Sequence, residues 1–469
     1  MYLRKKAIVS GCMAAFALAA SLSAQADDNL RINGFLTAGV TGSDVKSLPP
    51  CPSTGFSGAL VPSANCTTVT SATKSMQYGP YYDHIQNGGD WNNDTILGLQ
   101  TDYKIDDQSS MTAQFVSYGV QDYQVVDTWA YATWKPTNSW QFRVGRQRVP
   151  FYMLSEQLDV GMSYPWVRPP VEMYTNPVNS YDGISVKYNW MLGDWSGDLN
   201  FLAGQAPSSS NSPYIPLGFL IKNIRGMSFN IYEGNWTFHG GANIGNVNLN
   251  MQDDKTPGQL FNNLNQLLTA AGNGGIVDQL ASYYNLGTIY DNGSLLVMSE
   301  VSDLRYGSGS ILQDPMDGYI LVGYHMGNFL PNFTYSMTRT NSQGNSNRQT
   351  AINQINNNQY STQMMAFKNQ QLSACQAAGS SQSSCIGSGI TALSAAEQAL
   401  ANQGMQERMY TLGLRWDMTP KMSTKLEYSY VTGLGSNYGG FGGGGWGQFS
   451  DAPLGGHASI YSFVVNAMF

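Results

Sequence analysis

Apolar and polar side chains alternate over long segments of this sequence. At 421–430 one face carries Met422, Thr424, Leu426, Tyr428 and Tyr430, and the other carries Ser423, Lys425, Glu427 and Ser429. The final segment, 457–469, alternates in the same way. A β-strand points successive side chains to opposite faces, so this period of two predicts strands. The segments exceed the mean of about 5–6 residues for soluble strands and match the about 9–11 of membrane-crossing strands.

Composition decides what each face of these strands meets. Only 12% of the chain is charged, against about 25% in soluble domains, and it holds 28 Tyr and 51 Gly. There is no run of about 20 apolar residues that a membrane helix needs. The polar faces collect Lys, Arg, Asp, Glu, Gln and Gly together, unlike the outer face of a soluble sandwich. We therefore predict an all-β transmembrane antiparallel β-barrel, closed so that every backbone group is paired.

We predict sixteen strands, joined alternately by short turns and long loops. They are 30–40, 94–105, 110–120, 125–135, 139–149, 181–191, 195–204, 225–233, 236–249, 281–290, 294–304, 317–326, 331–340, 407–418, 421–432 and 457–469. The long connections are 41–93, 150–180, 205–224, 250–280, 341–406 and 433–456. Short periplasmic turns and long extracellular loops are typical of outer-membrane barrels. Helical spacing at 258–268 and Gln/Asn-rich and Ala-rich stretches in 350–403 predict short helices in two loops.

The first 26 residues have the features of a secretory signal peptide. Basic Arg4, Lys5 and Lys6 precede an apolar stretch that ends at the small-residue site Ala24-Gln25-Ala26. Val9 to Cys12 also resembles a lipoprotein cleavage box, but Lys6 stands too close to Cys12 for the ~7–15-residue apolar region of an export signal. We predict a cleaved signal at 1–26 and a single barrel domain at 27–469. No basic run follows the signal, so nucleic acid is not an expected partner.

The cysteines agree with export. After the signal, Cys51 lies near Cys66 and Cys375 near Cys385, each pair in a Ser/Gly/Ala-rich stretch. Of three possible connectivities, proximity favours 51–66 and 375–385 as two disulfides in an oxidising compartment. Zinc is the alternative, but no CxxC occurs and the four His are scattered. We predict no metal, no other cofactor and no enzyme, since GxSxG and a recognisable triad are absent from the sequence.

Several motifs together resemble the Gram-negative general outer-membrane porins. They are the first strand Arg31 to Val40, Val144-Gly-Arg-Gln147, the segment Tyr324 to Pro331, and a terminal Phe469 behind an aromatic strand. The resemblance spans 27–469, although 250–280 and 341–406 are longer than expected of that family. It implies a homotrimer in outer-membrane lipid and lipopolysaccharide that passes small hydrophilic solutes by passive diffusion. It also implies that Phe469 signals barrel assembly and that 150–180 folds inward as a constriction loop.

Charged residues gather around that loop. Arg143, Arg146, Arg148 and Arg168 share a short stretch with Glu156, Asp159 and Glu172. A wall of one sign facing a loop of the other would set a field across the pore that screens solutes. Alternatively, these Arg pair with the carboxylates and hold the loop down.

The alternation of side chains along the strand does not place all of these arginines on the same face. It places Arg143 in the lumen but Arg146 and Arg148 on the opposite face, unless Gly145 hosts a bulge or the strand ends there. We expect Arg143 and Arg146 to line the pore, and we make no prediction of the face on which Arg148 lies.

Parity names further pore-facing candidates along the other strands. They are Asp102, Lys104, Lys187, Asp198, Glu300, Arg415 and Lys425. Since both signs occur, we expect weak ion selectivity. Two other functions stay open: a substrate-specific channel with an anion or carboxylate site at the Arg cluster, and a surface adhesin or receptor that uses the loop 341–406.

Overall fold

The computed structural model describes most of the barrel and part of its loops. The described residues are 29–44, 75–77, 84–86, 89–121, 123–174, 178–208, 218–250, 278–307, 314–358, 362, 365–366, 369, 373, 406–434 and 456–469. The predicted signal peptide, the four remaining cysteines and the predicted helix at 258–268 lie outside them. Among these residues no helix is long and apolar enough to span a bilayer.

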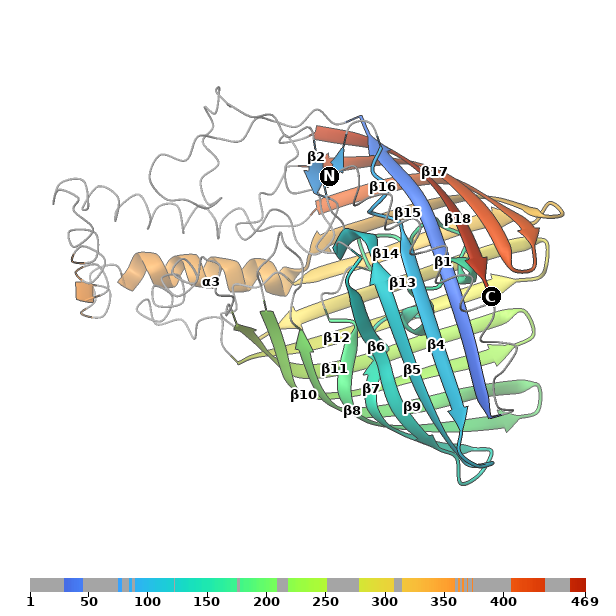
Figure 1. Cartoon of the computed structure of the whole chain (residues 1–469). Coiled ribbons are helices and arrows are strands. Elements are labelled where there is room, and N and C mark those ends of the chain that lie inside the picture. Colours follow the sequence, from blue (N-terminus) through green and yellow to red (C-terminus); the bar gives the residue numbers. More distant parts are fainter. Residues whose placement is uncertain are drawn as a thin grey trace.

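Sixteen antiparallel strands close into one barrel (Figure 1). They are β1 (Leu30–Ser43), β4 (Ile96–Lys104), β5 (Ser109–Tyr118), β6 (Val125–Trp134), β7 (Trp140–Arg148), β8 (Ser180–Leu192), β9 (Trp195–Ser208), β10 (Gly218–Glu233), β11 (Trp236–Asn250), β12 (Gln279–Asp291), β13 (Leu295–Tyr306), β14 (Pro315–Tyr324), β15 (Phe329–Thr340), β16 (Gln406–Thr419), β17 (Met422–Leu434) and β18 (Gly456–Met468). Each strand pairs with its neighbours in sequence, and β1 closes the ring by pairing with β18. The predicted sixteen-stranded antiparallel barrel is confirmed.

Smaller elements lie in the connections. A two-stranded ribbon joins β2 (Ser75–Gln77) to β3 (His84–Gln86), and three 3-10 turns are η1 (Gly119–Gln121), η2 (Ser155–Gln157) and η3 (Gly161–Ser163). The helix α3 (Ser342–Asn358) leaves the barrel at the end where the long loops emerge (Figure 1). It begins earlier than the helices expected within 350–403.

The strand boundaries agree with the alternation except where the backbone is irregular. β10 begins at Gly218 instead of the predicted 225, because a bulge between Lys222 and Arg225 breaks the period of two. Asn223 in that bulge has a φ of 53°. Gly145 has a φ of +127°, yet it pairs with Gly183 and the register between β7 and β8 runs on without a shift. A bulge at Gly145 therefore does not form.

The two faces of the barrel differ as the alternation requires. Outward-facing side chains are apolar and well exposed; they include Val144, Ile184, Phe201, Leu286, Val301, Leu412, Leu426 and Tyr461. Aromatic pairs gather outside near the short turns, such as Trp140 with Tyr188, Trp236 with Tyr290, and Phe329 with Trp416. Inward-facing side chains are mostly polar. The C-terminal residue helps to close the barrel between β1 and β18, because the Phe469 N–H donates to the Gly34 carbonyl at 3.0 Å.

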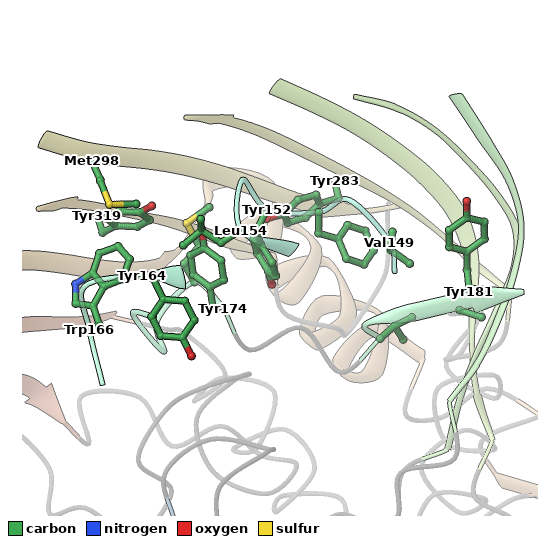
Figure 2. Close-up of a cluster of buried hydrophobic side chains, with 14 of the residues drawn as sticks. Val149, Tyr152, Leu154, Tyr164, Trp166, Tyr174, Tyr181, Tyr283, Met298 and Tyr319 are labelled. Atoms are coloured by element: carbon green, nitrogen blue, oxygen red, sulfur yellow. The ribbon is translucent and has the colours of Figure 1, made fainter. Parts of the chain in front are cut away.

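The described residues of the connection between β7 and β8, 149–174 and 178–179, lie inside the barrel. Their apolar side chains form one cluster with inward-facing residues of β8 to β15. Figure 2 shows a row that runs from Trp166 and Tyr319 past Tyr174 to Tyr152 and Tyr283. Trp166 meets Tyr319 edge to face at 5.3 Å between ring centroids. We call residues 149–174 and 178–179 the inserted loop; its hydrophobic packing fixes one side of the lumen.

Candidate functional site

Main-chain and side-chain hydrogen bonds tie the inserted loop to β13–β18 and β1. The Trp166 indole donates to Thr334 Oγ1 and the Val167 N–H to Glu427 Oε1, each at 2.7 Å. The Arg415 guanidinium donates to the Tyr164 carbonyl at 3.0 Å. These contacts connect residues far apart in sequence. We call this side of the lumen, the inward faces of β13–β18 and β1, the covered wall.

Arg168 makes the most extensive anchor on the covered wall. Its guanidinium donates to both oxygens of Asp94, at 2.8 and 2.6 Å, and also to the hydroxyls of Thr41 and Ser462. The side chains of Arg168 and Asp94 are 7% and 3% exposed. A bidentate pair with further hydrogen bonds is the arrangement that compensates two buried charges.

Arg148 and Asp159 form a second buried anchor at the rim of the barrel. Arg148 donates to Asp159, and the Tyr118 hydroxyl donates to the other Asp159 oxygen at 2.9 Å. Both charged side chains are at most 7% exposed. The sequence alternative in which arginines hold the loop down therefore describes Arg148 and Arg168 correctly, and these residues do not face open solvent.

Glu300 and Lys425 are not exposed pore-lining groups, so their prediction as pore lining is wrong. Glu300 is fully buried and accepts hydrogen bonds from the Met153 N–H at 2.8 Å and from the Tyr174 hydroxyl. Lys425 is 1% exposed and donates to the carbonyls of Gly161 and Trp166. Parity placed both side chains on the inner face, but the inserted loop covers them.

Glu172 lies on the inserted loop and is also buried, at 1% exposed. One of its oxygens accepts a hydrogen bond from Ser336 Oγ at 2.8 Å, and the other has no partner. Burial raises the pKa of Glu172 to about 7, because no cation compensates the loss of hydration. Glu172 therefore helps to hold the inserted loop against the wall, and the prediction that it lies at an open constriction is wrong.

Arg146 faces outward, so the prediction that it lines the pore is wrong. Its guanidinium donates to Asp182 and Asp127, each at 2.7 Å. It shares its face with Val144, which is 57% exposed and pairs with outward-facing Ile184. Because the register is unbroken at Gly145, simple alternation holds and Arg146 meets its partners on the outer surface.

The inserted loop packs on Tyr181 of β8 and on Leu202 and Ala206 of β9, in the halves of these strands nearer the long loops. It leaves uncovered the parts of β4–β9 next to the short turns, which we call the open wall. There Arg143 on β7 donates to Glu156 of the loop at 3.3 Å, with the two side chains 21% and 53% exposed. Arg143 also lies over the ring of inward-facing Tyr131, 4.9 Å from its centroid. Arg143 and Glu156 therefore form a direct ion pair that is partly exposed to water.

Further charged candidates occupy the open wall. Asp102 accepts hydrogen bonds from Thr112 at 2.8 Å and Gln100 at 2.9 Å. Lys187 lies 3.9 Å from Asp198, and Lys104 pairs with Asp107 at the short-turn end. Arg415 belongs to the covered wall, where it pairs with Asp417 at 2.8 Å. Both signs of charge are present on the open wall, and each is partnered.

Sequence reasoning missed several residues that fix the loop. Asp94, Tyr118 and Thr334 were not singled out, because their partners lie 41 to 168 positions away. Glu427 stood on a polar face by alternation but was not among the pore-facing candidates. Gly161 sits so close to the wall that a Cβ would overlap Asn466 Oδ1 and Thr37 Oγ1. Within the described part of the chain, no group of three His, Cys, Asp or Glu could hold a metal ion.

Comparison with known proteins finds similar folds at very low sequence identity. No protein-family profile matches the chain, and no curated protein matches its sequence. Outer-membrane expressed OmpT of Vibrio cholerae is 10% identical, covering 95% of this chain and 99% of that chain, with a TM-score of 0.49. Salmonella typhi OmpF in complex with daunomycin is 9% identical, covering 94% and 97%, at 0.48. The anion-selective porin from Comamonas acidovorans is 9% identical, covering 94% and 99%, at 0.48.

Proposed function

We propose that this protein is an outer-membrane porin, a water-filled channel through which small hydrophilic solutes and ions diffuse passively. The apolar exterior with its aromatic pairs near the short turns suits a wall in contact with lipid. A sixteen-stranded barrel leaves an aqueous channel unless something fills it. The inserted loop packs on the covered wall and on residues of β10–β12, and it leaves the polar open wall beside it.

The observation that carries this proposal is the exposure of Glu156 opposite Arg143. Glu156 sits on a loop inside the barrel, yet its side chain is 53% exposed. Water therefore reaches the lumen at the level of the inserted loop. This partly exposed ion pair would act on ions and dipoles that pass beside it, and its balance of charge favours weak selectivity.

Other functions find less support in the described residues. An anion or carboxylate site at the Arg cluster loses its basis, because Arg146 lies outside the barrel and Arg148 and Arg168 are buried in pairs. Ionisable groups of the open wall pair as salt bridges, not as a nucleophile and a base, which favours a channel over an enzyme. An adhesin role for 341–406 stays a prediction.

The proposal is tested by recording current through planar bilayers after adding the purified protein. We expect stepwise conductance that rises linearly with salt concentration, since a water-filled pore has no binding step to saturate. Liposomes that contain the protein should swell in a small sugar and not in a long oligosaccharide. Silent bilayers from protein that shows the gel mobility of a folded barrel would contradict the proposal.

We further propose a cleaved signal at 1–26, assembly as a homotrimer within lipid and lipopolysaccharide, and Phe469 as an assembly signal. The outer-face contact between Phe469 and Gly34, where a Cβ at Gly34 would overlap the ring, supports a role for Phe469 in closure. Mass spectrometry of the mature N-terminus and cross-linking in native membranes test the first two points. Deleting Phe469 should lower the folded yield.

A further inference from the structure

A pocket lies between the two ends of the inserted loop and the wall strands β10–β14. The loop contributes Phe151, Tyr152, Met173 and Val178, and inward-facing wall residues such as Val247 and Tyr283 complete it. It holds about 780 Å³ of empty space, part of which is open to solvent. The wall residues stand near the strand ends that adjoin the long loops, so the pocket lies at that end of the lumen.

Four aromatic rings line this pocket together with aliphatic side chains. Phe151 and Tyr152 both meet Tyr283 edge to face, at 4.9 and 5.9 Å between ring centroids. Tyr306 is a further lining residue. Tyr152 and Tyr283 lie next to each other in Figure 2. Rings presented at such angles offer both faces and edges, which favours stacking and edge contacts with another aromatic ring. A hydrated ion would gain little from this lining.

Two polar side chains in the pocket, Asn243 and Tyr283, have buried polar atoms without a hydrogen-bond partner, and the Tyr283 hydroxyl is one of them. Asn243 on β11 is 3% exposed, and neither its amide nitrogen nor its amide oxygen has a hydrogen-bond partner. More than about 90% of buried polar groups in proteins are paired, so an unpaired amide in a pocket marks a position for a ligand. A group that both accepts and donates a hydrogen bond would satisfy Asn243.

The charges around the pocket restrict the ligand further. No Lys or Arg occurs among the described residues that line it, and Asp317 is the only carboxylate there. Its two oxygens already accept hydrogen bonds from Thr338 and Ser302. An anionic ligand would find no counter-charge among these lining residues, so an uncharged ligand is favoured.

We propose that this pocket binds small aromatic molecules that carry an uncharged amide or hydroxyl group. The ring would lie against Phe151, Tyr152 and Tyr283, and the polar group would pair with Asn243. This is a selective binding site beside the channel, and it does not depend on the passive diffusion proposed above.

The test measures binding of benzamide and benzoate, which share a ring and differ in charge. Saturation-transfer NMR on the full chain in lipid nanodiscs reports each probe, and the pocket-filling variant Ala281→Phe corrects for partition into lipid, because Ala281 lines the pocket. Ala242→Phe is the matched control, since Ala242 pairs with outward-facing Met227 and Tyr284. Each variant is first checked for the gel mobility of the folded barrel.

We expect saturable benzamide binding to the wild type and to Ala242→Phe, and its loss in Ala281→Phe. Asn243→Leu keeps the shape and removes both hydrogen bonds, so it should weaken benzamide binding about tenfold. Benzoate should bind at least tenfold more weakly than benzamide. Equal benzamide signals from the wild type and Ala281→Phe, or benzoate binding as tight as benzamide, would overturn the proposal.

Discussion

The covered wall and the open wall of the lumen place the same types of charged residue in different environments. Where the inserted loop meets the covered wall, Arg168 of the loop and Lys425 of the wall are almost completely buried. On the open wall, Arg143 remains partly exposed opposite Glu156. The difference shows that inward orientation alone does not make a charged residue part of the pore, because the path of the loop decides which charges meet water.

The two walls also differ in what their charges do energetically. A charge buried with its partner has lost its hydration, so removing one partner leaves the other uncompensated at a cost of about 3–5 kcal/mol. An exposed pair is screened by water and contributes about 0–1 kcal/mol. Variants on the covered wall should therefore change stability, and variants on the open wall should change conduction.

The largest effect is expected at Arg168. Arg168→Ala leaves Asp94 buried without a counter-charge, and should cost about 3–5 kcal/mol of loop docking or barrel stability. The thermal midpoint of the shift in gel mobility from folded to unfolded barrel measures this loss. Arg146→Ala is the matched control on the outer face, where its carboxylate partners are partly exposed, and should cost about 1 kcal/mol or less. Equal losses in both variants would contradict the distinction between the two positions.

The stability of the folded protein should depend on pH through Glu172. Because its pKa is raised to about 7, the folded loop favours the neutral acid. Stability from this group is complete below its unfolded pKa of about 4.5 and declines as pH rises through 7, by up to about 3 kcal/mol. Glu172→Gln should raise the thermal midpoint at pH 8 more than at pH 5. A variant whose gain is the same at both values would show that Glu172 is not neutral in the folded protein.

Alternation predicted the barrel well because every strand has one face toward lipid and the other toward the interior of the barrel. Leu426 and Lys425, adjacent on β17, point to opposite faces as expected, at 52% and 1% exposed. The bulge near Asn223 was missed because one residue out of register removes the alternation that reveals a strand.

The candidate site was predictable only in part. Parity gave Arg143 and the inner-face position of Glu300, but it contains no information on where the inserted loop runs. That path depends on contacts between residues more than a hundred positions apart, such as Val167 with Glu427. For Arg146, parity alone was right, and Asp182 has the same outward parity on the paired strand. Gly145 is needed for a different reason, since a Cβ there would overlap the Ala130 carbonyl.

The close approach at Gly161 gives a third test of the covered wall. Gly161→Leu would force the loop away from Asn466 and Thr37, at a cost of about 1–3 kcal/mol for overpacking. We expect noisier single-channel current, because the displaced loop moves toward the open wall or samples several positions. Ser163→Leu is the control, since Ser163 lies in the same 3-10 turn but is exposed. Steady current from Gly161→Leu at the wild-type level would mean that this contact does not set the loop position.

The smallest energetic effect and the clearest functional one are expected on the open wall. Arg143→Ala removes the wall cation and leaves Glu156 exposed, so the pore should become more cation-selective, while Glu156→Gln should shift it the opposite way. Neither change should cost more than about 1 kcal/mol of stability, since the pair is partly exposed. Reversal potentials across a salt gradient measure both shifts, with Arg146→Ala as the control that should leave selectivity unchanged. If Arg146→Ala shifted the reversal potential as much as Arg143→Ala, conduction would not follow the open wall, because Arg146 lies on the other side of the barrel wall.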